Sequence, residues 1–123
     1  MEPRALARQL GRLIRETSEY KKMEDARAKV EEHEAARLML QDFKRRQEEY
    51  RRALAKGEDA QEAGRELQRL AEIIGYNPYL REFFAAEARL AELVLGLQGE
   101  IMAAAGLAEA DVKGEKTPDA KSG

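Results

Sequence analysis

Apolar residues recur every three or four positions along most of this chain, which is the spacing of one face of an α-helix. The pattern predicts four helices, which we place at Pro3 to about Glu16, Glu19 to Ala55, Asp59 to Ile74, and Pro78 to about Ala105. Short turns between amphipathic helices favour antiparallel neighbours. We therefore expect an all-α, elongated fold of antiparallel helical hairpins or a bundle of about four helices, two of them long.

Residues that favour helix ends separate the predicted helices. Ser18 is the predicted N-cap of the second helix, because its hydroxyl can accept from free backbone N–H groups. Gly57 and Gly106 follow the second and fourth helices, where glycine can adopt the left-handed conformation that closes a helix. Asn77 followed by Pro78 supplies a cap and a first helical residue, and it is the strongest boundary in the chain.

The second predicted helix is long for a chain of this size. At 1.5 Å per residue it would span roughly 55 Å, whereas a compact chain of 123 residues has a radius of gyration of about 14 Å. Either the molecule is elongated or this helix breaks. The apolar pattern weakens around Glu32–Glu34, which makes this stretch the candidate for a kink, but neither Gly nor Pro marks a break there, so a continuous helix stays open.

The fourth predicted helix carries an apolar seam that alternates by three and four residues. Such a repeat favours a coiled-coil-like partner helix. The seam consists of Leu80, Phe83, Glu87, Leu90, Val94, Leu97, Ile101 and Ala104. Because one hairpin would leave part of this face in water, we expect a homodimer or a paralogous heterodimer. The predicted helical domain covers residues 1–106, and the polar tail over 107–123 is predicted to be disordered.

Composition excludes several classes of chemistry. The chain has no Cys and one His, which excludes disulfide frameworks, Cys-ligated metals, thiol catalysis and sites with several histidines. Serine and threonine are almost absent, and no phosphate-binding glycine loop occurs. We therefore expect no enzyme activity, no catalytic residues, no cofactor and no metal site.

Charge is unevenly distributed along the chain. The net charge is −2, but residues 1–56 carry 15 basic and 11 acidic residues, a net of +4, whereas residues 57–106 have a net charge of −5. This asymmetry suits self-association or the packing of one half on the other. We also expect no signal peptide and no membrane insertion, so the predicted location is the cytoplasm.

Two polar residues lie on the apolar faces. A buried Glu87 would need a partner, which His33 or Arg37 could supply across the interface between the two long helices. The pair could act as an acid and a base, or it could set helix register. We favour the structural interpretation, because no nucleophile or metal cluster accompanies these residues.

A basic cluster ends the second predicted helix. Arg45, Arg52 and Lys56 share one face, which could contact RNA phosphates or an acidic protein partner. Glu48 and Glu49 dilute this charge, so a solvated helix face is the favoured interpretation.

Several short motifs then resemble one known family. They are Ser18-Glu19-Tyr20, Ala26, Val30, Glu34-Ala35, Leu38, Phe43 and Gln47, followed by Asn77-Pro78, Ala86-Glu87, Leu90 and Ile101. In this order they resemble the YlbF/YmcA family of small all-helical bacterial regulatory proteins, over about residues 4–104.

The resemblance implies regulation rather than catalysis. Relatives influence competence, sporulation and biofilm formation, and some act in a complex that directs a membrane-anchored endoribonuclease to mRNA processing. Members of that complex carry C-terminal cysteines linked to iron–sulfur clusters, which this chain lacks. We expect a non-catalytic adaptor that binds a protein partner through its helices; the alternative is an RNA-binding accessory factor that uses Arg45, Arg52 and Lys56.

Overall fold

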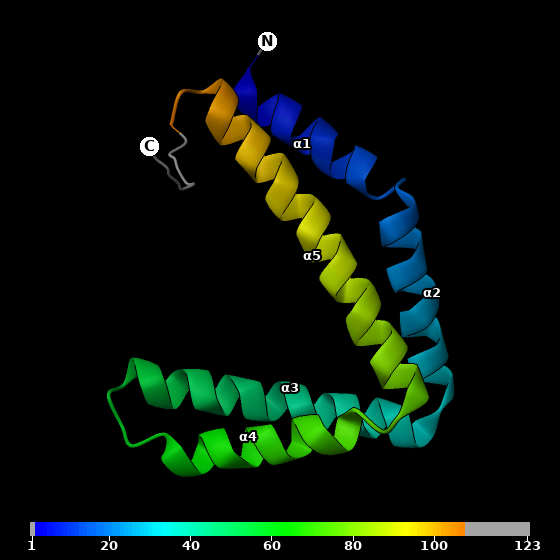
Figure 1. The fold of residues 1–123 in the computed structure, drawn as a ribbon, viewed down its shortest axis with the longest axis vertical. Coiled ribbons are helices and arrows are strands. Elements are labelled where there is room, and N and C mark those ends of the chain that lie inside the picture. The colour runs from blue at the N-terminus through cyan, green and yellow to red at the C-terminus, as the bar shows by residue number, and fades with distance from the viewer. Residues whose placement is uncertain (1, 108–123) are drawn as a thin grey trace, which may run out of the picture. The chain divides into compact units, whose positions relative to one another are not determined.

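The computed structural model describes residues 2–107, which form five α-helices and no strand (Figure 1). The helices are α1 (Pro3–Ile14), α2 (Ser18–Glu32), α3 (Glu34–Ala55), α4 (Gln61–Ile74) and α5 (Pro78–Ala104). The all-α prediction is confirmed. The predicted disordered tail lies, apart from Leu107, outside the described residues. The chain divides within α5 into two units, Met1–Glu87 and Ala88–Gly123.

The long second helix of the prediction breaks at His33, so of the two alternatives that the sequence left open the structure has the interrupted helix, within the stretch where the apolar pattern weakens. His33 has extended backbone angles (φ −116°, ψ 109°), so it ends α2 and precedes α3. Its ring Nδ1 lies 2.7 Å from the Lys29 carbonyl oxygen, to which the Nδ1–H donates. The ring also stacks on Tyr79, with the ring centroids 3.8 Å apart. The break therefore has specific contacts on both sides of the histidine.

The start of α2 differs by one residue from the prediction. The N-cap is Thr17, whose Oγ1 accepts from the Tyr20 N–H at 3.2 Å. Ser18 is already helical, so the predicted Ser18 cap is wrong. The Thr17 hydroxyl also donates to the Ile14 carbonyl at 2.6 Å, which joins the end of α1 to the start of α2.

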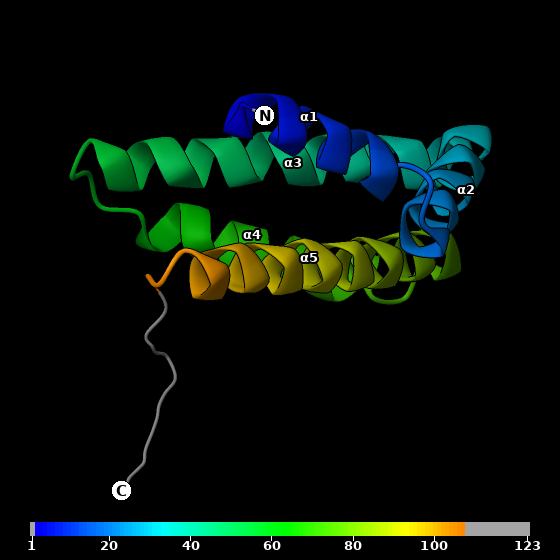
Figure 2. The same ribbon diagram turned by 90° about the horizontal axis from the view of Figure 1, so that it is seen from above.

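Helices α3 and α4 pack side by side as an antiparallel hairpin (Figures 1 and 2). Gly57 follows α3 with a φ of +72°, the left-handed conformation expected of it. Arg46 of α3 pairs with Glu66 of α4 at 3.5 Å. At Gly64 a β-carbon would lie 3.2 Å from the Tyr50 ring, so the glycine allows the two helices to approach closely.

The start of α5 follows the predicted Asn-Pro signal. The Asn77 Oδ1 accepts from the N–H groups of Tyr79 and Leu80, at 3.0 and 3.1 Å. Pro78 is the first helical residue, where its missing N–H costs nothing. The helix then continues without interruption to Ala104, and Gly106 follows with a φ of +75°.

The hydrophobic core lies within the unit Met1–Glu87 and draws on four of its helices. Its largest fully buried side chains are Phe83, Leu80 and Val30. The remaining buried apolar residues are Met23, Ala26, Ala36, Leu40, Ile74 and Ala86. Because α2, α3, α4 and the first turns of α5 all contribute, this core determines how those elements are placed. No residue of α1 is buried.

Candidate interaction surface

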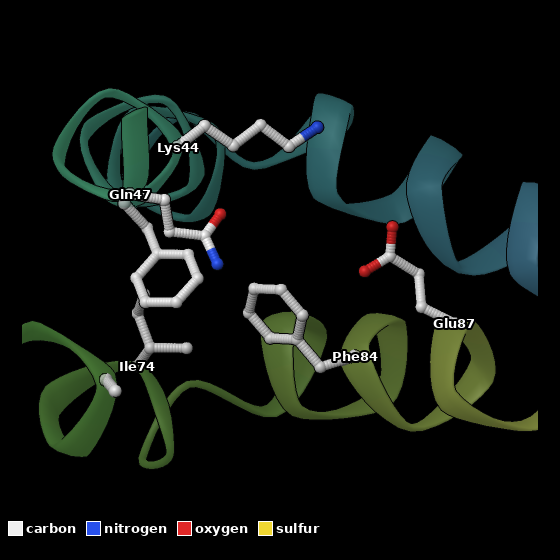
Figure 3. A pocket seen from close by; sticks show the side chains of 7 residues that line it. Lys44, Gln47, Ile74, Phe84 and Glu87 are labelled. Atoms are coloured by element: carbon white, nitrogen blue, oxygen red, sulfur yellow. The ribbon is translucent and has the colours of Figure 1, made fainter. Parts of the chain in front are cut away.

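A hollow of about 490 Å³ opens between α3, α4 and the first turns of α5 (Figure 3). Its apolar lining is Phe43, Ala71, Ile74 and Phe84, and its polar lining is Lys44, Gln47 and Glu87. The Phe43 and Phe84 rings meet edge to face, with centroids 5.5 Å apart. The lining offers apolar contact and two opposite charges, and it contains no serine, threonine or histidine. This hollow was not predicted from the sequence. Its one signal was the pair of adjacent aromatics Phe83 and Phe84: neighbouring helical residues face different directions, so the two rings could not both point into the same core.

The predicted pairing of Glu87 does not form within the unit Met1–Glu87. Glu87 is exposed at the edge of the hollow, so the expectation of a buried carboxylate is wrong. His33 instead stacks on Tyr79, and Arg37 lies 4.0 Å from Glu34 on its own helix. The physical reason is the break at His33, which redirects the ring toward the start of α5.

The seam residues of α5 separate into two groups. Phe83 is only 1% exposed and belongs to the core. Farther along the helix Leu90, Val94 and Leu97 are half-buried, and Ile101 is 54% exposed. Large apolar side chains are also exposed off the seam, at Leu95 and Met102. The part of α5 beyond Glu87 therefore presents apolar side chains to solvent.

Two of the three residues in the predicted basic cluster have carboxylate partners on α3. Arg45 pairs with Asp42 and, at 3.1 Å, with Glu49, while Arg52 lies 3.3 Å from Glu48. Lys56 is exposed just after the helix.

The pairs on α3 also shift the titration of one carboxyl. Hydrogen bonds from Arg51 hold the pKa of Glu48 below its usual value of 4.5, and the same contact raises the pKa of Arg51. On α4, Arg65 lowers the pKa of Glu62 in the same way. The pairs on these two helices are i,i+3 and i,i+4 contacts along a single helix, in which a carboxylate lies beside each of these arginines.

Known proteins place this chain in a family. The family model for control of the competence regulator ComK, YlbF/YmcA, matches residues 4–104. This chain belongs to the YlbF/YmcA family. The resemblance carried by the short motifs is thereby confirmed.

The relatives of this YlbF/YmcA protein include several bacterial proteins named UPF0342. One from Caldicellulosiruptor bescii is 33% identical over 90 residues, covering 72% of this chain and 76% of that protein. STH1710 of Symbiobacterium thermophilum is 34% identical over 89 residues, covering 72% and 80%.

A solved structure shares the fold. It is Bacillus subtilis RicA in complex with RicF, which matches with a TM-score of 0.60 and 21% identity over 84% of this chain and 92% of that chain. Among residues 2–107, no helix is both long and apolar enough to cross a membrane.

Proposed function

We propose that this protein is a non-catalytic regulatory adaptor that acts by helix-mediated protein–protein interaction. The observation that carries the proposal is the exposure of apolar side chains on α5 beyond Glu87. Leu95 is 65% exposed, Ile101 54% and Met102 44%. Residues 90–107 contain only two charged residues, Glu92 and Glu100, so little charge would need to be desolvated when a partner covers this helix.

The favoured partner is a second copy of the chain or a paralogue. The seam over Leu90, Val94, Leu97 and Ile101 keeps the 3.5-residue repeat that suits a facing helix. RicA, which shares this fold, was solved in complex with RicF, and this supports binding to a protein partner. The name of the family supports a regulatory role.

From the family resemblance we infer control of RNA processing through an endoribonuclease complex, or of competence, sporulation or biofilm formation. The alternative role, RNA binding by Arg45, Arg52 and Lys56, stays a prediction. The carboxylates that pair with Arg45 and Arg52 argue against it, because a phosphate would have to displace them.

Light scattering after size exclusion tests the proposal. We expect the wild-type chain to elute at twice its 13.9 kDa mass or more, and the double variant Leu97→Gln with Ile101→Gln to shift toward the monomer. Glu92→Gln is the matched control, because it changes an exposed polar residue of the same helix. Circular dichroism should show unchanged helix content in both variants.

A pulldown from the native host, read by mass spectrometry, covers the case of a paralogue or another protein partner. Tagged wild-type and Glu92→Gln chains should recover the same partner, and the double variant should lose it. A chain that is monomeric at micromolar concentration and recovers no partner sensitive to the double variant would refute the adaptor role.

A further inference from the structure

Helix α1 carries a row of arginines with no acidic residue between them. Arg4, Arg8 and Arg12 lie within the helix and Arg15 follows it, and the chain has no acidic residue between Pro3 and Arg15. All four side chains are exposed. None forms an ion pair with a carboxylate of residues 2–87. We call these four residues the arginine stripe.

The contacts around the arginine stripe leave its charges available. Glu2 caps the helix by accepting from the Arg4 backbone N–H at 2.9 Å, so it engages the backbone rather than a guanidinium. The Arg15 guanidinium carbon lies 6.0 Å from the centroid of the Tyr20 ring. On α3, in contrast, Arg45, Arg51 and Arg52 all have carboxylate partners.

Helix geometry aligns the stripe on one side of α1. At 3.6 residues per turn, the spacings of four, four and three place all four arginines within an arc of about 80°. The row is about 16 Å long, with steps of about 6 Å between residues four apart. The apolar positions Leu6, Leu10 and Leu13 are centred about half a turn away, on the opposite face.

We propose that the arginine stripe binds the sugar–phosphate backbone of a single-stranded nucleic acid. Guanidinium groups present paired N–H donors that match phosphate oxygens, and a straight row of four matches a linear polyanion. Such a ligand contacts the arginine face alone and leaves the leucine face free for helix packing. The assignment is independent of the adaptor role of α5.

The geometry argues against a lipid surface as the ligand. A helix lying on a bilayer buries its apolar face at the level of the headgroups. With Leu6, Leu10 and Leu13 in the bilayer, the arginines of α1 would point away from the lipid phosphates into water. A nucleic acid approaches from the arginine side and has no such conflict.

Salt-dependent binding of a labelled oligonucleotide tests the proposal. Fluorescein-labelled U20 is titrated with the full chain at about 50 to 200 mM NaCl and followed by anisotropy. Four phosphate contacts to a single strand give a slope of about −2.8 in a plot of log K against log salt, so affinity should fall about 50-fold across this range. Because the stripe contacts the backbone, labelled dT20 should show a similar slope.

Two matched triple variants locate the binding surface. R4Q/R8Q/R12Q removes three charges from α1. The slope of log K against log salt should become shallower, at about −0.7, so that affinity falls only about two- to three-fold over the same salt range. R45Q/R51Q/R52Q removes three charges from α3, and its slope should match that of the wild type. Glutamine has a high helix propensity, so the variants should keep their helix content, which circular dichroism checks. R4K/R8K/R12K keeps the positive charges and should therefore retain most of the slope.

Several results would overturn the proposal. One is the absence of U20 or dT20 binding at 50 mM salt. Another is an equal loss in the α1 and α3 triple variants, which would indicate a general charge effect. A third is binding through α1 to polyglutamate or to vesicles of phosphatidylserine and phosphatidylcholine, without binding to either oligonucleotide.

Discussion

Replacing Phe83 by alanine is the most direct test of the hydrophobic core of residues 1–87. The sequence predicted Phe83 as part of the apolar seam of the fourth helix, and its side chain is 1% exposed within the core of residues 1–87. Truncating a buried phenylalanine removes its burial energy and leaves a cavity, at a cost of about 3–5 kcal/mol. With a urea dependence of about 2 kcal/mol per molar for a chain of this size, the unfolding midpoint should fall by about 2 M.

Urea unfolding followed by circular dichroism measures this shift. Phe84→Ala is the matched control, because Phe84 is the next residue but is only half-buried and lines the hollow. Its truncation should cost less, on the order of 1 kcal/mol. A loss at position 84 that equals or exceeds the loss at position 83 would refute the assignment of Phe83 to the core. A loss that grows on dilution would place Phe83 at a subunit interface instead.

Three further changes probe other contacts. Asn77→Ala should lower the free energy of unfolding by about 1 kcal/mol in the same urea assay, since it removes the cap of α5, whereas Asn77→Asp should keep the cap. Tyr79→Leu should cost about 0.5–1.5 kcal/mol through loss of the His33 stack, and Tyr79→Phe should cost much less; equal losses would exclude the stack as the cause. The pKa of Glu48 is lower in the folded protein than its usual value of 4.5, so its pairing stabilises the fold fully above pH 4.5. This stabilisation is lost as the pH falls through the lower pKa of the folded state. Thermal melts from about pH 6 to about pH 3 should therefore show a shallower loss in Glu48→Gln than in the wild type, with Glu72→Gln as a control on α4.

The sequence by itself determined the elements of this protein. Periodic apolar spacing predicted helices wherever the described chain is helical, and the Asn77-Pro78 signal located the start of α5 to the residue. Both succeed because they depend on interactions within a few residues: one face of a helix must avoid water, and a helix start must satisfy its free N–H groups. The start of α2 was predicted one residue too late, because Thr17 and Ser18 both carry a hydroxyl that can cap a helix and the local sequence does not distinguish between them.

The arginine stripe of α1 is also readable from the sequence, because it depends on spacing and on the absence of nearby acidic residues. What spacing does not show is that Arg45 and Arg52 of α3 are paired with carboxylates while the arginines of α1 form no ion pair within residues 2–87. That contrast depends on side-chain conformations along each helix.

Only the tertiary structure decided which side chains from distant segments meet. The stack of His33 on Tyr79, the edge-to-face contact of Phe43 with Phe84, and the exposure of Glu87 all join or separate residues more than 40 positions apart. A stripe on one helix specifies that a face is buried but not which partner covers it, because any apolar face of similar size satisfies the same requirement. The break at His33 determines which faces pack together, because it sets the direction of α3 and therefore which side chains line the hollow.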